Sequence, residues 1–319
     1  MENNSIKKAS VLVPCYNEES SLPELLEALS TLMQQNQQYS WEIILVDDGS
    51  KDGTLEIIKK QNSLDVRFGF ISFSRNFGKE AAILAGLDYA KGDCAIIIDA
   101  DLQHPPSVIP VMLKEWENGY EDIYAKRTDR GKEPWLRRKM TMLYYHLLQN
   151  MSNIDILPNV GDFRLLDRKC IDAIKQLRET QRYTKGMYCW IGFKKKEILF
   201  EQGDRQKGSS SFNFWRLLKL SIEGITSYTT SPLRISTILG LFASLLSFGY
   251  MLYIIFKTIF YGEPVSGFPT IMAVMLFLGG AQLLSLGIIG EYLGRIFHET
   301  KKRPVYLVSE HEPAKSLEK

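Results

Sequence analysis

Cysteine, net charge and two common nucleotide-binding motifs are scarce or absent in this sequence. Its 319 residues include four cysteines, which lie far apart and form no C-x-x-C pair. This predicts free thiols in a reducing compartment and argues against a structural zinc site. Lys and Arg total 39 against 37 for Asp and Glu, a net charge of +2, so we expect no nucleic-acid partner. The absence of a G-x-G-x-x-G after the first apolar run and of a Walker lysine motif disfavours a dinucleotide-binding fold and a P-loop NTPase.

Short β-rich runs alternate with helical patterns over roughly the first 230 residues. This alternation predicts an α/β domain with a mostly parallel sheet covered by helices on both faces. In such sheets ligands bind beyond the carboxyl ends of the strands. The predicted strands are Ser10–Val13, Glu42–Val46, Phe68–Phe73, Cys94–Ile98 and Ile123–Ala125, and the predicted helices are Ser21–Gln35, Thr54–Lys60, Lys79–Ala90 and Ser107–Glu117.

Two long stretches without a charged residue follow, at 235–256 and 264–290. At about 1.5 Å rise per residue, each is long enough to cross a hydrocarbon core about 30 Å thick. We therefore predict a transmembrane hairpin over residues 231–303, with a pair of buried core helices as the alternative. Basic residues flank the outer ends of both stretches, so both termini are expected to be cytoplasmic. Residues 304–319 form a short polar tail that we expect to be loose.

Polar motifs stand where the predicted strands end. Asp99 and Asp101 follow an apolar strand, and two carboxylates there can share Mg²⁺, with Gln103 supplying a carbonyl oxygen. The alternative is an Asp-rich turn, and a turn role is also what we expect of His104. The Asp47–Ser50 segment either caps the next helix or gives a carboxylate to a uracil imide or a ribose hydroxyl.

Four motifs in order carry a family resemblance: residues 10–18, 44–50, 74–80 and 98–105. They resemble the successive motifs of GT-A glycosyltransferases of inverting family two. With the two apolar stretches, the chain is similar to bacterial polyisoprenyl-phosphate glycosyltransferases, relatives of dolichol-phosphate mannose synthase, from about residue 8 to 305. The resemblance implies a cytoplasmic, Rossmann-like GT-A domain over residues 1–230, anchored in the cell membrane by the hairpin.

The resemblance also implies roles for individual residues. Asp162 matches the usual candidate for the catalytic base, and Asp101 is assigned to catalysis as well. The segment Arg205–Ser209 resembles the acceptor-binding loop of the family, although Ser209–Ser211 stands where the family often has Glu-Ser-Lys. Donor binding is expected from Pro14, Tyr16, Glu18, Asp48, Lys79 and Asp99, and binding of Mg²⁺ or Mn²⁺ from Asp99, Asp101 and Gln103.

A lipid phosphate acceptor needs cationic side chains in its binding site. The phosphate carries a charge of about −1.5 to −2 and must approach an anionic donor. Two basic segments, 125–139 and 202–219, can supply them, unless they are simply solvated faces. Both run into aromatic amphipathic stretches suited to a bilayer surface. The acceptor candidates are Arg127, Arg137, Arg205 and Lys207. Because this phosphate is already ionised, a base is barely needed, and orienting the sugar is the alternative role for Asp162.

The resemblance implies transfer of a hexose, with glucose favoured, from a UDP-sugar to undecaprenyl phosphate with inversion. One alternative is a processive polysaccharide synthase, which would need more membrane spans and usually a Gln-x-x-Arg-Trp motif. The other is a catalytically inactive membrane scaffold. The resemblance further suggests a homo-oligomer such as a tetramer. Because the donor motifs lie before residue 105, we expect a chain ending at Ser231 to retain UDP-sugar binding.

Overall fold

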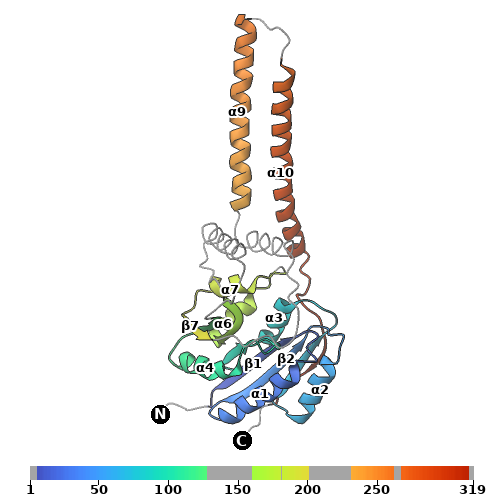
Figure 1. Cartoon of the computed structure of the whole chain (residues 1–319), viewed down its shortest axis with the longest axis vertical. Coiled ribbons are helices and arrows are strands. Elements are labelled where there is room, and N and C mark those ends of the chain that lie inside the picture. The colour runs from blue at the N-terminus through green and yellow to red at the C-terminus, as the bar shows by residue number, and fades with distance from the viewer. Residues whose placement is uncertain (1–5, 128–159, 181, 201–230, 262–266, 316–319) are drawn as a thin grey trace. The chain divides into compact units, whose positions relative to one another are not determined.

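The computed structural model of the chain describes residues 6–127, 160–180, 182–200, 231–261 and 267–315 (Figure 1). The chain divides into two compact units. One consists of residues 1–214 together with 304–319, and the other of residues 215–303. A β-sheet with its covering helices makes up the first unit, and two long helices make up the second.

An eight-stranded sheet forms the centre of the first unit, in the order β7-β5-β6-β4-β1-β2-β3-β8. The pairs β1–β2, β1–β4, β2–β3 and β5–β7 are parallel, and β3–β8, β4–β6 and β5–β6 are antiparallel. The prediction of an α/β fold with a mostly parallel sheet is confirmed. The strands are β1 Lys8–Cys15, β2 Ser40–Asp47, β3 Phe68–Phe73, β4 Cys94–Ile97, β5 Asp122–Arg127, β6 Val160–Asp167, β7 Lys195–Phe200 and β8 Val308–Glu312.

Helices cover both faces of this sheet, as predicted. Helices α1, α2 and α4 pack into one hydrophobic cluster, and α3, α6 and α7 pack into a second. All four predicted helices are present, the last one preceded by a short 3-10 turn, η1. The helical elements are α1 Leu22–Gln35, α2 Thr54–Leu64, α3 Lys79–Tyr89, η1 Pro106–Val108, α4 Ile109–Glu117, α6 Arg168–Gln176 and α7 Thr184–Trp190.

The central strands contain unbroken apolar runs because both of their faces are buried. In β1, Val11 and Val13 belong to one cluster and Leu12 to the other, and all three are at most 1% exposed. Neighbouring side chains of a strand point to opposite faces, so a two-sided core requires an unbroken apolar run rather than alternation. The parallel pairing of β1 to β4 places the carboxyl ends of these strands, and the polar loops after them, at one edge of the sheet.

The C-terminal segment is not loose, and that expectation was wrong. Residues Val308–Glu312 form β8, which pairs antiparallel with β3 at the edge of the sheet. The tail is polar in sequence, yet backbone hydrogen bonds to an edge strand do not depend on apolar side chains. The sequence pattern of a solvent-facing edge strand is therefore hard to distinguish from that of a coil.

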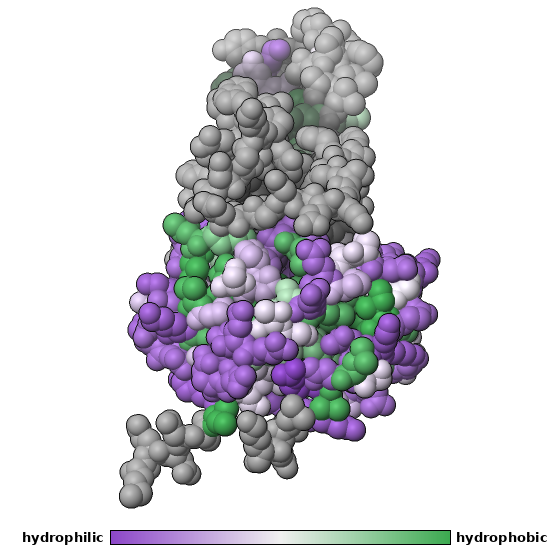
Figure 2. All heavy atoms as spheres, turned by 60° about the horizontal axis from the view of Figure 1, so that its bottom comes forward, coloured by the Kyte–Doolittle hydropathy of each residue, from purple (hydrophilic) through white to green (hydrophobic). Residues whose placement is uncertain are grey.

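The second unit contains two long helices, α9 Ser231–Tyr261 and α10 Phe268–Thr300. Within the described residues, none of the helices combines the length and apolarity needed to cross a membrane. Large apolar side chains of both helices are nevertheless exposed, among them Leu241, Phe242 and Leu283, which are 62%, 59% and 72% exposed. By contrast, the face of the first unit seen in Figure 2 is mainly hydrophilic, with scattered apolar residues.

Candidate active site

The carboxylates after β4 lie together with an imidazole. Oxygen atoms of Asp99 and Asp101 and a ring nitrogen of His104 all lie within 4.8 Å of one another, a spacing that suits one metal ion. His104 is 3% exposed and stacks on Phe163, with 5.0 Å between ring centroids. The sequence predicts only a turn role for His104, whereas the structure brings its side chain to the carboxylate pair. The backbone N–H of Gln103, our third predicted ligand, donates to Asp101 Oδ1 at 3.1 Å.

Asp162 joins this group because of how β6 pairs with β4. The two strands are antiparallel, with Ile97 opposite Arg164. Continuing this register by two residues places Asp162 beside Asp99. The Lys79 ammonium, from the first residue of α3, bridges them: its Nζ lies 2.6 Å from Asp99 Oδ1 and 3.0 Å from Asp162 Oδ2. The structure thus assembles three predicted residues from segments that are distant in sequence.

The ion pair fixes the charge state of Asp162. Burial alone would raise the pKa of this carboxyl, but the positive charges of Lys79, Lys185 and Arg164 together outweigh burial and hold the pKa below its ordinary value. Burial would likewise lower the pKa of Lys79, and the two carboxylates raise it instead. Both groups are therefore charged near neutral pH. The other oxygen of Asp162, Oδ1, is buried and has no hydrogen-bond partner among the described residues, so it is available to a ligand.

Asp48 holds a loop rather than pointing into open space. It is 2% exposed, and its carboxylate accepts hydrogen bonds from the backbone N–H groups of Phe77, at 2.6 Å, and Gly78, at 2.9 Å. Burial raises its pKa, although these two N–H groups oppose the shift. At the next position Gly49 has φ +67, and a Cβ there would lie 2.5 Å from the backbone carbon of Arg75. The 47–50 turn thus packs tightly against the segment that leads to Lys79.

A hollow of about 600 Å³ lies beside this turn. Of the residues predicted to surround a nucleoside, Tyr16 lines it and is 43% exposed. Pro14, Glu18 and Asp48 are not among its lining residues. The lining consists of Tyr16, Asp47, Gly49, Ser50, Lys51, Leu55, Ser72, Phe73, Ser74, Arg75, Asn76, Ser309 and Glu310. Backbone groups, hydroxyls and cations of this kind can hold an uncharged heterocycle beside an anionic group.

The predicted acceptor residues lie almost wholly outside the described part of the chain. Arg127 is the last residue of β5, but its side chain is not described. Arg137, Arg205 and Lys207 fall within residues 128–159 and 201–230, which also lie outside it. Their assignment to the acceptor phosphate remains a prediction.

Two charged residues near Asp162 escaped the sequence analysis. The pKa of Glu80 is raised to about 7, because the carboxyl is buried and lies near the negative charge of Asp162, although it accepts the Thr184 N–H at 3.1 Å. Arg164 forms a buried ion pair with Asp122 at 3.1 Å. Glu80 is the last residue of the 74–80 motif. Its burial results from tertiary packing, which no local sequence pattern indicates.

The site thus combines a mixed α/β sheet with two carboxylates at the end of β4 and a third carboxylate on the antiparallel β6. The Mycobacterium tuberculosis glucosyl-3-phosphoglycerate synthase is among similar solved structures, with a TM-score of 0.46 and 17% identity, covering 69% of this chain and 78% of that one. The sequence comparisons are closer. Glycosyl transferase family 2 matches residues 10–175, and a GtrB C-terminal hairpin matches residues 231–296.

Full-length relatives agree with these matches. An uncharacterised glycosyltransferase of Synechocystis is 44% identical over 305 residues, covering 94% of each chain. The bactoprenol glucosyl transferase of Shigella phage SfV is 42% identical over 301 residues, covering 94% of this chain and 98% of its own. The chain belongs to glycosyl transferase family 2 and is a glycosyltransferase, as the sequence motifs predicted.

Proposed function

We propose that this enzyme transfers a hexose, with glucose favoured, from a UDP-sugar to bactoprenol (undecaprenyl) phosphate. The observation that carries the proposal is the 42% identity to bactoprenol glucosyl transferases over nearly the whole of both chains. The acceptor phosphate oxygen forms a bond to the anomeric carbon while the bond from that carbon to the UDP oxygen breaks. UDP leaves with the electron pair, and the sugar inverts its anomeric configuration.

The residues present fit a divalent cation. Two carboxylates and an imidazole within 4.8 Å offer the oxygen-rich donor set that Mg²⁺ or Mn²⁺ accepts. Asp99, Asp101 and His104 would hold the ion, and Gln103 stays the further predicted ligand. When bound, the ion would supply positive charge next to the diphosphate of the donor.

Asp162 is better suited to orient the sugar than to remove a proton. Its pKa lies below the ordinary value because the charges of Lys79, Lys185 and Arg164 outweigh burial, and a weak base takes up protons poorly near neutral pH. The acceptor phosphate is itself ionised, so it brings no proton that must be removed. The unpartnered, buried Oδ1 can instead accept a hydrogen bond from a sugar hydroxyl.

The acceptor phosphate is proposed to bind Arg127, Arg137, Arg205 and Lys207. The support is chemical, because the ionised lipid phosphate needs cations beside an anionic donor. Replacement of Arg205 by Ala is expected to raise the KM for lipid phosphate, by about 10-fold or more if one charge-assisted hydrogen bond is lost. The KM for the UDP-sugar should change little. A defect confined to the donor KM would remove Arg205 from the acceptor site.

We further propose that the hairpin unit attaches the enzyme to the cytoplasmic membrane, with spans at 235–256 and 264–290 and both termini in the cytoplasm. Support comes from the two charge-free stretches, the basic residues at their outer ends, and the exposed apolar side chains of α9 and α10. This goes further than the helices as described, none of which qualifies as a span. Labelling of single cysteines placed in the 257–263 link and at the C-terminus, in intact cells, tests the topology.

The family resemblance also supports a homo-oligomer such as a tetramer, which light scattering on the purified enzyme would measure. The reaction itself is tested with the full chain in detergent, UDP-glucose and undecaprenyl phosphate. We expect UDP release only when the lipid phosphate and a divalent cation are both present, and a product with one hexose per lipid by mass spectrometry. UDP release without the lipid, or a product with many hexoses, would contradict the proposal.

A further inference from the structure

The pocket beside the 47–50 turn is built by both ends of the chain. Most of its lining comes from loops before residue 77, such as Tyr16 and Arg75. Ser309 and Glu310, however, come from β8 near the C-terminus. No local pattern in the tail hints at this role, because the juxtaposition depends on the pairing of β8 with β3.

The strand pairing is irregular at the pocket. Ser72 of β3 pairs with Glu310, but the next residue, Phe73, pairs with Val308, so Ser309 is an extra residue between two paired positions. An extra residue of this kind is a β-bulge, which bends the strand and redirects a side chain, and bulges often occur next to binding sites. The bulge therefore lies where β8 borders the pocket, and it places Ser309 there.

Contacts on both sides of the bulge hold β8 in place. Before it, the Tyr306 hydroxyl donates to Asp88 Oδ2 at 2.7 Å, and its ring stacks on Phe73 at 5.1 Å between centroids. After it, the backbone N–H of Lys315 donates to the Val66 carbonyl at 2.7 Å. A segment anchored at both ends loses little further conformational entropy when a ligand binds, so its side chains are pre-organised.

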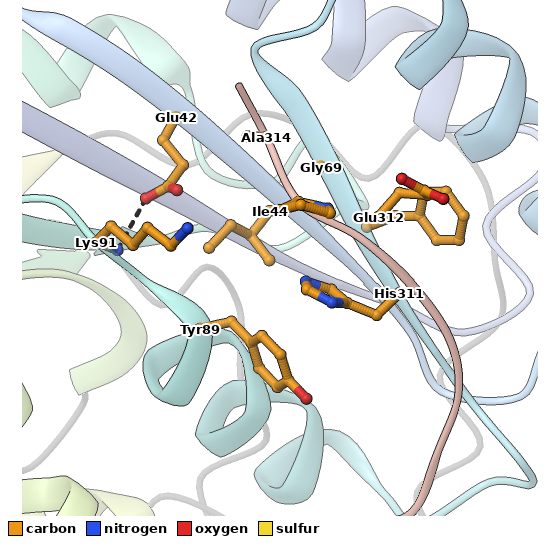
Figure 3. A pocket seen from close by; sticks show the side chains of 10 residues that line it. Glu42, Ile44, Gly69, Tyr89, Lys91, His311, Glu312 and Ala314 are labelled. Atoms are coloured by element: carbon orange, nitrogen blue, oxygen red, sulfur yellow. Dashed lines mark hydrogen bonds between the residues drawn. The ribbon is translucent and has the colours of Figure 1, made fainter. Parts of the chain in front are cut away.

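The following residues of β8 face a separate, smaller pocket. Figure 3 shows His311 beside the Tyr89 ring, with 4.5 Å between ring centroids, and Glu312 on the same segment. The chain passes so close to Gly69 that a Cβ there would collide with the backbone of Ala314. Glu312 therefore provides a carboxylate on the same strand that does not line the larger pocket.

Among the described residues that line the larger pocket, Glu310 is the only acidic side chain besides buried Asp47. Its carboxylate lies 2.6 Å from Lys59 Nζ, which fixes one of its oxygens. A carboxylate accepts hydrogen bonds and repels phosphates, so it suits the uncharged part of a nucleotide, where ribose hydroxyls and a uracil imide donate. The lysine and arginine of the pocket suit the phosphates.

We propose that β8 is part of the donor site, and that Ser309 and Glu310 contact the nucleoside of the sugar donor, with Glu310 accepting a hydrogen bond from it. This inference rests on the proposed use of a nucleoside diphosphate sugar. The strand β8 follows the hairpin unit directly in the chain, because α10 ends at Thr300 and β8 begins at Val308. A chain that ends at Ser231 lacks β8, so under this proposal it should bind the UDP-sugar more weakly than the full chain does.

The test is equilibrium binding of UDP, with Mg²⁺, to the full chain in detergent, followed by steady-state kinetics. Replacement of Glu310 by Gln should weaken UDP binding about 10-fold, because a charge-assisted hydrogen bond becomes a neutral one. The KM for UDP-glucose should rise in parallel, while kcat and the KM for lipid phosphate stay within about twofold. If the donor group is a ribose hydroxyl, the Glu310→Gln variant should also lose discrimination against 2′-deoxy-UDP.

Two control variants separate contact from structure. Glu312→Gln, on the same strand but outside the pocket, should leave UDP binding unchanged. Lys59→Met removes the ion pair without removing the carboxylate, so a defect as large as that of Glu310→Gln would mean that only the ion pair matters and would overturn the inference. Unchanged UDP binding by Glu310→Gln would also overturn it. If the wild type binds another nucleoside diphosphate instead of UDP, the proposed donor is wrong, and the variants are then compared with that nucleotide.

Discussion

Replacing Lys79 with methionine should tighten the binding of a divalent cation in the absence of nucleotide. Lys79 Nζ lies 2.6 Å from Asp99 Oδ1, so the protein's own ammonium already neutralises one of the proposed metal ligands. An incoming cation must compete with that ion pair and is repelled by its positive charge. Methionine keeps an unbranched, flexible side chain but carries no charge, so it removes the competition with little change in packing.

The size of this effect follows from the distance and the exposure. At 2.6 Å, two unit charges attract by about 1.6 kcal/mol in water and about 6 kcal/mol at an effective dielectric constant of about 20. The side chain of Lys79 is 44% exposed and that of Asp99 is 23% exposed, which favours the aqueous end of this range. A gain of about 1–2 kcal/mol corresponds to a Kd for the cation that is about 5- to 30-fold lower.

The assay is titration of the full chain in detergent with Mn²⁺, with free Mn²⁺ followed by electron paramagnetic resonance. Lys51→Met is the matched control. Lys51 lines the neighbouring pocket, and among the ion pairs of the described residues none joins it to Asp99. Turnover of Lys79→Met should fall despite the tighter binding of Mn²⁺. Loss of the ammonium raises the pKa of Asp162, and a protonated Asp162 accepts a hydrogen bond from the sugar less well. Unchanged or weaker Mn²⁺ binding would refute the view that Lys79 competes with the metal.

Three further predictions concern other charged residues. Asp101→Ala should abolish turnover and leave thermal stability and membrane association unchanged; near-normal activity, or activity with excess chelator, would exclude the metal assignment. Arg164→Met should lower the free energy of unfolding by about 3–5 kcal/mol, because it leaves the carboxylate of Asp122 buried and unpaired. Urea unfolding measures this, and adding Asp122→Leu should restore much of the loss. Because the pKa of Glu80 is raised from 4.5 to about 7, its contribution to stability is complete below pH 4.5 and is lost as the pH rises through about 7. Melting temperatures of Glu80→Gln should lack that decline, and an identical pH profile for both proteins would contradict the burial argument.

Local sequence patterns are enough to predict the first five strands, the first four helices and the family. These elements follow from local patterns: an apolar run such as Val11–Val13 is buried on both faces, and the apolar residues of α1 recur at helical spacing. The polar motifs after β1 to β4 were correctly placed at one edge of the sheet, because the carboxyl ends of parallel strands lie together. The two long helices of the hairpin were likewise evident from uninterrupted apolar stretches.

Contacts between residues that are distant in the sequence depend on the packed fold. Asp162 reaches Asp99 because β6 runs antiparallel to β4 in one register, and a shift of one residue would turn its side chain to the other face. The same holds for Ser309 and Glu310, which reach the pocket through the pairing of β8 with β3. The carboxylate of Asp48 accepts backbone hydrogen bonds from a loop thirty residues away in the sequence. Strand register and backbone hydrogen bonds between distant segments depend on the whole packed sheet, and no local pattern of side chains encodes them.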